Sequence, residues 1–386
     1  MNIKQLDQTY VAHTYARFPL EIVSGRGSLV YDETGKRYID LTSGIGVLAL
    51  GVADAEWAAA VTAQLGTLQH MSNLFYTAPA AQLAEMLCAR TGMKRVFFSN
   101  SGAEANECAI KTARKYAAEK KGADVFTILT LEKSFHGRTL ATLSATGQDH
   151  YHAQFRPLLP GFVHTPANDL DALKAAAAEH RLAAVMVECV QGEGGVLPLE
   201  KSFLQGAAAF CAEHDILLIV DEVQTGNGRT GTLYAYEQFG VRPDLVTTAK
   251  GLGGGLPLGA CLMGEKVQDV LQPGDHGSTY GGNPAACAGA LNVLGRIDDA
   301  LLASVREKSA YLFDTFSGAP GIESVTGLGL MIGLKTTKDA KEILAACREK
   351  GVLALTAKDK IRLLPALNIP TDQLAEAAEI LKDACK

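Results

Sequence analysis

The sequence predicts an α/β protein with a mainly parallel central sheet and a second, smaller α+β unit. Its 386 residues are too many for one hydrophobic core. Helical and strand patterns alternate from about residue 79 onward. The runs ILLIVDE and PDLVTTAK are almost continuously apolar, as in strands that are buried on both faces of a sheet. We expect a large domain over 46–285 and a small domain over 286–386, joined by the N-terminal segment 1–45.

Capping and turn signals define the expected elements of the large unit. PAAQLAEMLCARTG has proline near a helix start and glycine just past its end, and KRVFFSN has the composition of a short strand. The alternation then continues as helix, strand, helix, strand and helix, over SGAEANECAIKTARKYAAEK, ADVFTILTLE, DLDALKAAAAEH, LAAVMVECV and residues 200–214.

The pattern changes after about residue 283. A long helical stretch runs through Phe313, and short β segments are expected around GLMIGLKT, VLALT and IRLLP. Near the N-terminus, SLVYDETGKRYIDL predicts strands that turn at a glycine, and these are the elements expected to join the small unit.

Composition and charge exclude several classes of function. The net charge of −6 comes from mixed signs without a basic block, so nucleic-acid binding is not expected. The chain has neither an apolar run long enough for a membrane span nor a signal-like start, and we predict a cytoplasmic protein. Eight cysteines without a CxxC pair and nine histidines without HExxH spacing predict no disulfide frame and no metal.

Ligands of parallel α/β sheets gather at the carboxyl ends of strands, and the first such end is SNSGAEAN. Ser101, Gly102 and Ala103 lie between the strand KRVFF and a helix, where free N–H groups and the helix dipole favour an anion such as phosphate. A plain serine N-cap with a tight turn gives the same pattern.

The second strand end carries Asp221, which follows five apolar residues. Burying a carboxylate costs several kcal/mol unless a cation or strong donors face it, so we expect a positive partner. A cap or loop hydrogen bond is the structural alternative. Glu222 points the opposite way if the strand alternation continues.

The third strand end carries Lys250, in VTTAKGLGGGLPLG. A desolvated lysine loses its proton more easily, which suits Schiff-base chemistry, although many such lysines only extend along the surface. GLGGGL lacks the sixth-position glycine of a dinucleotide fingerprint, and Pro257 interrupts the helix that should follow. Taken together, a phosphate cradle, a buried anion and a strand-end lysine are what pyridoxal phosphate needs.

Six motifs, in order along nearly the whole chain, resemble the class III aminotransferases of pyridoxal-phosphate fold type I: SGAEANE, FHGRT, DEVQTGNGRTG, AKGLGGGLPLGA, HGSTYGGNP and IRLLP. The resemblance implies that Lys250 binds the cofactor aldehyde and shuttles a proton, and that Asp221 keeps the pyridine nitrogen protonated. It assigns the phosphate to Ser101 and Gly102.

The same resemblance assigns further contacts to the cofactor. Phe135 packs on the ring face, and Val223 and Gln224 lie beside the ring. Thr279 reaches the phosphate of the neighbouring subunit, which implies a homodimer with shared active sites.

Substrate recognition falls to arginines, whose donor fork suits carboxylates. By resemblance, Arg138 binds the remote α-carboxylate of an acylated donor, with Ser278 of the partner chain nearby, and Arg362 holds the α-carboxylate of glutamate or 2-oxoglutarate. Glu193, flanked by glycines, is expected to pair with Arg362 in one half-reaction and to swing away in the other. A surface ion pair is the structural alternative for either arginine.

Within the class, the sequence most resembles the members that act on acetylated ornithine in arginine biosynthesis. The apolar Ile45 stands where ornithine-specific members typically carry tyrosine, which leaves room for an acyl group. Succinyl-diaminopimelate, ornithine and 4-aminobutyrate remain alternative donors, and a cofactor-binding protein without turnover is the alternative from another class. LGVADAEW replaces the usual histidine-containing segment, so the contacts there stay open.

Overall fold

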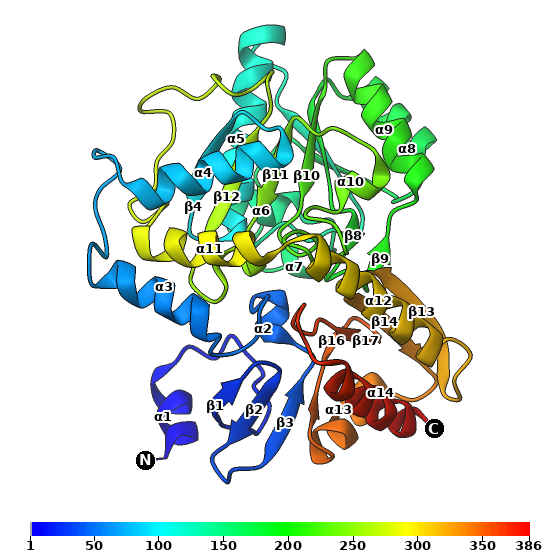
Figure 1. The fold of residues 1–386 in the computed structure, drawn as a ribbon. Helices are drawn as coiled ribbons and strands as arrows, with labels where there is room; N and C mark the ends of the chain where they lie inside the picture. The colour runs from blue at the N-terminus through cyan, green and yellow to red at the C-terminus, as the bar shows by residue number, and fades with distance from the viewer. Residues whose placement is uncertain (1) are drawn as a thin grey trace.

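The computed structural model describes residues 2–386. Figure 1 shows an upper region in which a large sheet is enclosed by helices, and a lower region that contains segments from both ends of the chain. Among the described residues, no helix combines the length and apolar character needed to cross a membrane.

The upper region is built on a seven-stranded sheet in the order β4-β12-β11-β10-β7-β5-β6. All of its strands run in one direction except β12, which is antiparallel to both of its neighbours. The predicted α/β class with a mainly parallel sheet is therefore confirmed. The strands are β4 (Arg95–Ser99), β5 (Thr127–Leu131), β6 (Phe162–Thr165), β7 (Leu182–Val187), β10 (Leu217–Asp221), β11 (Leu245–Thr248) and β12 (Gly259–Met263).

Strand β12 was not expected from the sequence. It follows a glycine-rich stretch directly, and its own residues, GACLM, include a glycine and an alanine that favour strands weakly. All five residues are nevertheless buried, because the strand fills the space between β11 and β4.

The sheet separates two hydrophobic cores, as the alternation of strand side chains requires. On β10, Leu218 and Val220 belong to one core, and Leu217 and Ile219 belong to the other. Helix α5 packs in the second core, whereas α4, α9 and α11 pack in the first. This burial on both faces explains the unbroken apolar strand sequences.

Most predicted helices are present with shifted ends. The long helical stretch is an exception, because it is two helices separated at Ile297 and Asp298, and Asp298 caps the second. The helices of the upper region are α3 (Ala55–Leu65), α4 (Ala78–Thr91), α5 (Gly102–Lys121), α6 (Leu140–Ala145), α7 (Asp149–His152), α8 (Leu170–Glu179), α9 (Lys201–Glu213), α10 (Tyr236–Phe239), α11 (Pro284–Arg296) and the 3-10 turn η1 (Lys250–Gly253).

The lower region contains two small sheets. The N-terminal strands share one of them with a late strand, because β15 pairs in parallel with β3. Its strands are β1 (Ile22–Arg26), β2 (Leu29–Asp32), β3 (Arg37–Asp40) and β15 (Val352–Leu353). The domain boundaries at 45 and 285 stay a prediction.

The second small sheet is antiparallel, in the order β13-β14-β17-β16. Its strands are β13 (Ile322–Leu328), β14 (Met331–Thr336), β16 (Leu355–Ala357) and β17 (Lys360–Leu363). The remaining elements are α1 (Ile3–Tyr10), α2 (Ser43–Gly46), β8 (Val190–Gln191), β9 (Leu197–Pro198), α12 (Asp299–Phe316), α13 (Ala340–Glu349) and α14 (Thr371–Cys385).

Candidate active site

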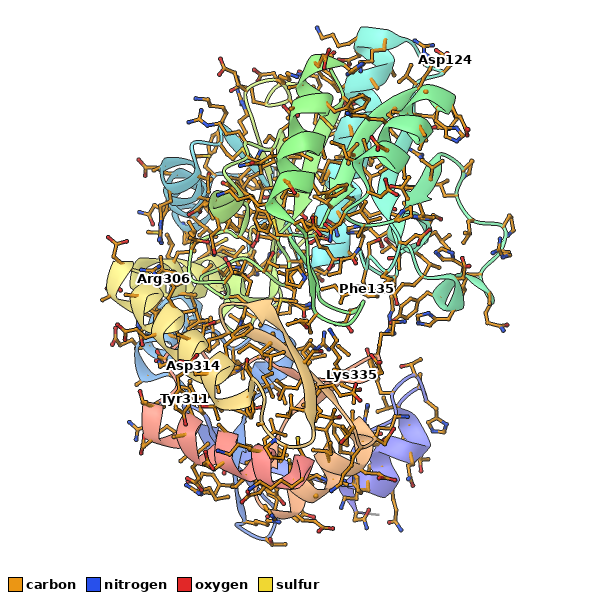
Figure 2. The ribbon with its side chains drawn as sticks, turned by 90° about the vertical axis from the view of Figure 1, so that its right-hand side faces the viewer. Asp124, Phe135, Arg306, Tyr311, Asp314 and Lys335 are labelled. Carbon is orange, nitrogen blue, oxygen red and sulfur yellow. The ribbon has the colours of Figure 1, made fainter. Side chains whose placement is uncertain are left out.

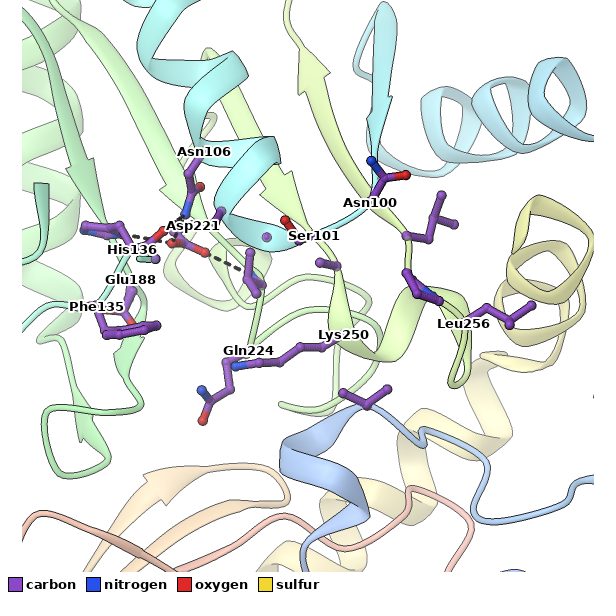
Figure 3. A pocket seen from close by; sticks show the side chains of 18 of the residues that line it. Asn100, Ser101, Asn106, Phe135, His136, Glu188, Asp221, Gln224, Lys250 and Leu256 are labelled. Atoms are coloured by element: carbon purple, nitrogen blue, oxygen red, sulfur yellow. Dashed lines mark hydrogen bonds and ion pairs between the residues drawn. The ribbon is translucent and has the colours of Figure 1, made fainter. Parts of the chain in front are cut away.

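A cavity of about 360 Å³ opens at the carboxyl ends of the parallel strands. Figure 3 shows side chains of Ser101, Asp221 and Lys250 around it, each from a different segment. The lining residues are Val47, Asn100, Ser101, Gly102, Ala103, Asn106, Phe135, His136, Gly137, Glu188, Asp221, Val223, Gln224, Ala249, Lys250, Gly255, Leu256, Pro257 and Leu258.

The cavity has an anion-binding character where α5 begins. Ser101 is the N-cap of this 20-residue helix, and its Oγ accepts a hydrogen bond from the N–H of Glu104 at 3.2 Å. The remaining free N–H groups of the first turn carry the positive end of the helix dipole. A Cβ on Gly102 would lie 2.6 Å from Cγ1 of Val223, so only glycine fits this wall.

Asp221 forms another part of the wall and is almost fully buried. Its Oδ2 accepts from Nδ1 of His136 and Nδ2 of Asn106, both at 2.8 Å, and its Oδ1 accepts from the N–H of Val223 at 3.0 Å. Oγ1 of Thr247 donates to Oδ1 of Asn106 at 2.6 Å and thereby orients the amide. We expected a positive partner for Asp221. Within residues 2–386, a histidine ring and neutral donors face its carboxylate instead.

Glu222 points away from the cavity, as strand alternation predicted. Its Oε1 accepts from the N–H of Tyr236 at 2.8 Å, and its Oε2 accepts from Oγ1 of Thr225 at 2.5 Å. Burial raises the pKa of Glu222 to about 7.

Lys250 reaches the cavity from a turn and not from a strand end. Strand β11 stops at Thr248, and Lys250 begins η1 with φ of +39°, a strained conformation for a non-glycine residue. Burial lowers the pKa of the Lys250 amine, while the carboxylates of Glu193 and Asp221 partly oppose this effect. A lowered pKa makes a neutral amine more accessible near neutral pH.

Glu193, Gln224 and Arg362 form a hydrogen-bonded group beside the cavity. Nη1 of Arg362 donates to Oε1 of Glu193 at 2.5 Å and to Oε1 of Gln224 at 3.1 Å. Burial alone would raise the pKa of Glu193, but the charge and hydrogen bond of Arg362 hold it below its usual value. Nε of Arg362 is buried and, within residues 2–386, has no partner, which leaves a donor for a ligand.

Sequence reasoning missed several residues of the wall, including Asn100, Asn106, His136 and Glu188. Glu188 accepts from the N–H groups of Phe135 at 2.8 Å and Gly192 at 3.3 Å, and burial raises its pKa to about 7. The signal for Glu188 was an acid that interrupts the apolar run LAAVMVECV. His136 and Asn106 lie inside the quoted motifs FHGRT and SGAEANE, but only the fold brings them to Asp221.

Five predicted residues lie outside the lining: Glu193 and Arg362, described above, and Arg138, Ser278 and Thr279. Arg138 is exposed, with its guanidinium 5.5 Å from the ring centroid of Tyr151, and that ring meets Phe135 edge-on at 5.5 Å. Figure 2 places Phe135 between the upper and lower regions. Ser278 and Thr279 lie in a loop at the surface, where Oγ of Ser278 accepts from Nδ2 of Asn100 at 3.2 Å.

The atypical segment LGVADAEW supports the lysine turn. Asp54 caps α3, and the indole of Trp57 donates to the carbonyl of Gly253 at 3.2 Å. A Cβ on Gly254 would lie 2.6 Å from the indole nitrogen, so the glycines after Lys250 allow the ring to pack against the turn.

Comparisons with known proteins find relatives over nearly the whole chain. The family model described as "Aminotransferase class-III" matches residues 10–385. The chain is 51% identical to the acetylornithine aminotransferase of Haemophilus ducreyi, over 98% of this chain and 97% of the relative. It is 45% identical to the acetylornithine aminotransferase of Gloeobacter violaceus, over 99% of this chain and 97% of the relative.

Solved structures share the fold over nearly the full length. The N-acetylornithine aminotransferase of Stenotrophomonas maltophilia is 39% identical with a TM-score of 0.86, covering 98% of this chain and 97% of that one. An ornithine aminotransferase of Toxoplasma gondii, described with PLP at its active site, is 32% identical with a TM-score of 0.94, covering 99% of this chain and 93% of that one.

Proposed function

The chain belongs to the class-III aminotransferases, and on that premise we propose that it transfers the terminal amino group between N2-acetyl-L-ornithine and 2-oxoglutarate. The products are N-acetyl-L-glutamate 5-semialdehyde and L-glutamate. The observation that carries the proposal is the meeting of Lys250, Asp221 and the N-terminus of α5 around one cavity. We place the reaction in arginine biosynthesis and in the cytoplasm, as the sequence resemblance implies.

The cofactor is pyridoxal 5'-phosphate, whose aldehyde binds amines covalently and whose ring withdraws electrons from the carbon that bears the amine. The residues of the cavity fit this group. Among residues 2–386, no lysine or arginine lies within ion-pair distance of Asp221, so its charge is available to a protonated ring nitrogen. The α5 N-terminus, kept open by Gly102, suits the phosphate.

The surrounding residues then have defined tasks. His136 and Asn106 hold the Asp221 carboxylate in place. Ser101, Ala103, Phe135 and Val223 line the cavity; Ser101 and Ala103 would hold the phosphate, and Phe135 and Val223 would flank the ring. Lys250, whose amine has a pKa lowered by burial, would hold the aldehyde of the cofactor, and its neutral amine would accept and return a proton at the substrate carbon.

Arg362 and Glu193 allow one site to accept two different amines. Glutamate has a carboxylate beside its reacting amine, and the unused Nε donor of Arg362 suits that carboxylate. The terminal amine of acetylornithine has no such neighbour, and Glu193 then keeps Arg362 neutralised. We assign the remote carboxylate of the acetylated donor to Arg138, which Tyr151 supports, with Ser278 from a partner chain nearby.

The proposal includes a homodimer. Loop residues Met71, Leu74, Phe75, Tyr76 and Tyr280 form an exposed apolar patch. Hydrogen bonds from Nδ2 of Asn73 to the carbonyls of Ser278 and Gly281, both at 2.9 Å, join the two loops that carry it.

This apolar patch is continuous with the active site. A second cavity of about 440 Å³ is lined by Tyr280 and shares Asn100, Leu256 and Pro257 with the first. A partner chain on the patch would bring its own Thr279 toward this opening, as the resemblance implies.

Steady-state kinetics test the proposed substrate. The purified, cofactor-loaded protein would be assayed with 2-oxoglutarate and four donors: acetylornithine, succinyl-diaminopimelate, ornithine and 4-aminobutyrate. We expect the highest kcat/KM with acetylornithine and loss of turnover in Lys250→Ala. A higher kcat/KM with any other donor would overturn the assignment, and hydride trapping followed by mass spectrometry would identify the lysine that holds the cofactor.

A further inference from the structure

Arg229 is a buried cation that the proposed mechanism does not use. It lies in the TGNGRTG segment, eight residues after Asp221, the last residue of β10, and is 2% exposed. Among residues 2–386, no carboxylate lies within ion-pair distance of its guanidinium. A buried charge without a counter-ion costs several kcal/mol, so its presence needs a reason beyond stability.

The partners of Arg229 are backbone carbonyls at the ends of two neighbouring strands. Its Nη1 donates to the carbonyl of Leu330, just before β14, at 3.2 Å, and to the carbonyl of Pro365, just after β17. The N–H of Leu330 returns a hydrogen bond to the carbonyl of Arg229 at 2.9 Å. These strands pair with each other, and Arg362 lies opposite Gly333 in their register.

The same segment also contacts the cofactor side of the site. Gln224 accepts a hydrogen bond from Arg362, as described above. Nδ2 of Asn227 donates to Oγ1 of Thr248 at 3.0 Å and to the carbonyl of Ala249, the residue before Lys250, at 3.1 Å. Residues 221–229 therefore connect the lysine turn to the strand that carries the carboxylate-binding arginine.

We propose that Arg229 is a positioning residue that fixes the end of β17, and thereby sets where Arg362 meets the carboxylate beside a reacting amine or keto group. This inference rests on the proposed function. It predicts an effect on glutamate and 2-oxoglutarate, whose carboxylate uses Arg362. The acylated donor is affected much less, because Arg362 faces Glu193 while that donor reacts.

The test uses Arg229→Met and Arg229→Lys in the cofactor-loaded protein. Methionine fills much of the same volume but leaves both carbonyls without a donor, whereas lysine keeps the charge but lacks the planar fork. For Arg229→Met we expect KM for glutamate to rise about tenfold, the equivalent of about 1.4 kcal/mol, with a smaller change in kcat. KM for acetylornithine should change less than threefold, and Arg229→Lys should fall between the parent and Arg229→Met.

A binding measurement adds a readout without turnover. Glutarate is a dicarboxylate that has neither an amine nor a keto group. Calorimetric titration of Arg229→Met with glutarate should show a rise in Kd equal to the rise in KM for glutamate. The matched control is Arg306→Gln, because Arg306 on α12 also anchors the segment by donating to the carbonyl of Gly231 at 2.5 Å. Within residues 2–386, its side chain makes no hydrogen bond or ion pair with β14 or β17. Arg306→Gln should leave the ratio of KM for glutamate to KM for acetylornithine unchanged.

Other outcomes overturn the inference. If Arg229→Met raises KM for glutamate and KM for acetylornithine by the same factor, or leaves the Kd for glutarate unchanged, a positioning role is rejected. If neither variant folds, as judged by its thermal unfolding, Arg229 serves the fold alone. A parent enzyme without transaminase activity on acetylornithine would instead refute the proposed function, so the two failures are distinguishable.

Discussion

Asp221 and Glu222 are adjacent carboxylates whose surroundings give them opposite properties. Asp221 accepts three hydrogen bonds at the cavity wall, whereas Glu222 is enclosed away from the cavity and accepts from Tyr236, Thr225 and the thiol of Cys189. Two residues of the same charge can differ this way because successive side chains of a strand face different environments.

Glu222→Gln tests the environment of the buried acid. Its pKa is raised from 4.5 to about 7 in the folded protein, so between these values the unfolded chain loses the proton and the folded protein keeps it. The acid therefore lowers stability progressively as pH rises from about 4.5 to 7, by on the order of 3 kcal/mol in total. Glutamine does not ionise and therefore removes this loss of stability. The unfolding temperature of Glu222→Gln minus that of the parent should therefore increase as the pH rises from about 4.5 to 7.

The control for this experiment is the exposed Glu179, on α8. The unfolding temperature of Glu179→Gln should equal that of the parent at every pH. If the difference in unfolding temperature between Glu222→Gln and the parent stays constant from pH 4.5 to 8, the pKa of Glu222 is not raised.

Glu193→Ala tests the paired function of Arg362. Removing the carboxylate leaves the guanidinium with Gln224 alone, so its charge is no longer neutralised when the ω-amine donor is bound. We expect the half-reaction with acetylornithine to slow by at least about tenfold more than the half-reaction with glutamate. Rapid-mixing spectroscopy of each half-reaction gives both rates, and equal slowing would rule out the switch.

At the scale of secondary-structure elements, short irregular segments shape the site. Ser43–Gly46 is a left-handed turn with φ values of 46°, 61°, 66° and 75°, and it leads to Val47 in the cavity wall. The β-branched Ile45 is held in this conformation by bonds from the N–H groups of Gly46 and Val47 to the carbonyls of Thr42 and Ser43. The sequence placed Ile45 near the acyl group only by resemblance, and its backbone conformation could not be predicted.

The start of α5 permits a test of the anion site. In Gly102→Ala the new Cβ must displace Val223, which lies 2.6 Å away, and overpacking of this kind costs about 1–3 kcal/mol. We expect the Kd of the apoprotein for pyridoxal phosphate to rise about tenfold or more, as measured by fluorescence titration. Gly295→Ala is the matched control, because Gly295 lies in α11 with open space around its Cβ position and should leave that Kd unchanged.

At the scale of the whole molecule, the apolar patch around Tyr76 predicts association. Leu74 is 89% exposed, and Tyr76 is fully exposed, in a loop that Figure 1 places at the left edge, between α3 and α4. Water-exposed apolar patches of this kind mark interfaces. The double variant Leu74→Glu/Tyr76→Glu should therefore shift the mass in light scattering from twice the 40.8 kDa chain toward a single chain, and should lower activity with it.

Ala175→Glu, on the exposed face of α8, introduces the same kind of change away from the patch. It should keep the parent mass and activity. A parent that is monomeric in solution, or a double variant that stays dimeric, would contradict this interface.

The sequence by itself determined the class of the fold and three parts of the site. Unbroken apolar runs require a sheet that is buried on both faces, and polar residues at the ends of such runs must gather at one edge. Ser101, Asp221 and Lys250 could therefore be predicted together, because each directly follows a strongly patterned segment. Their assigned roles in binding and catalysis stay predictions.

Only the tertiary structure decided which residues complete those parts. His136 and Asn106 are 85 and 115 positions from Asp221, and Arg229 bonds a carbonyl 136 positions away. Contacts of this range depend on how helices and strands pack, which local periodicity does not encode. For the same reason the sequence could mark TGNGRTG as a motif, but only the packing of β14 and β17 against it gives Arg229 a task.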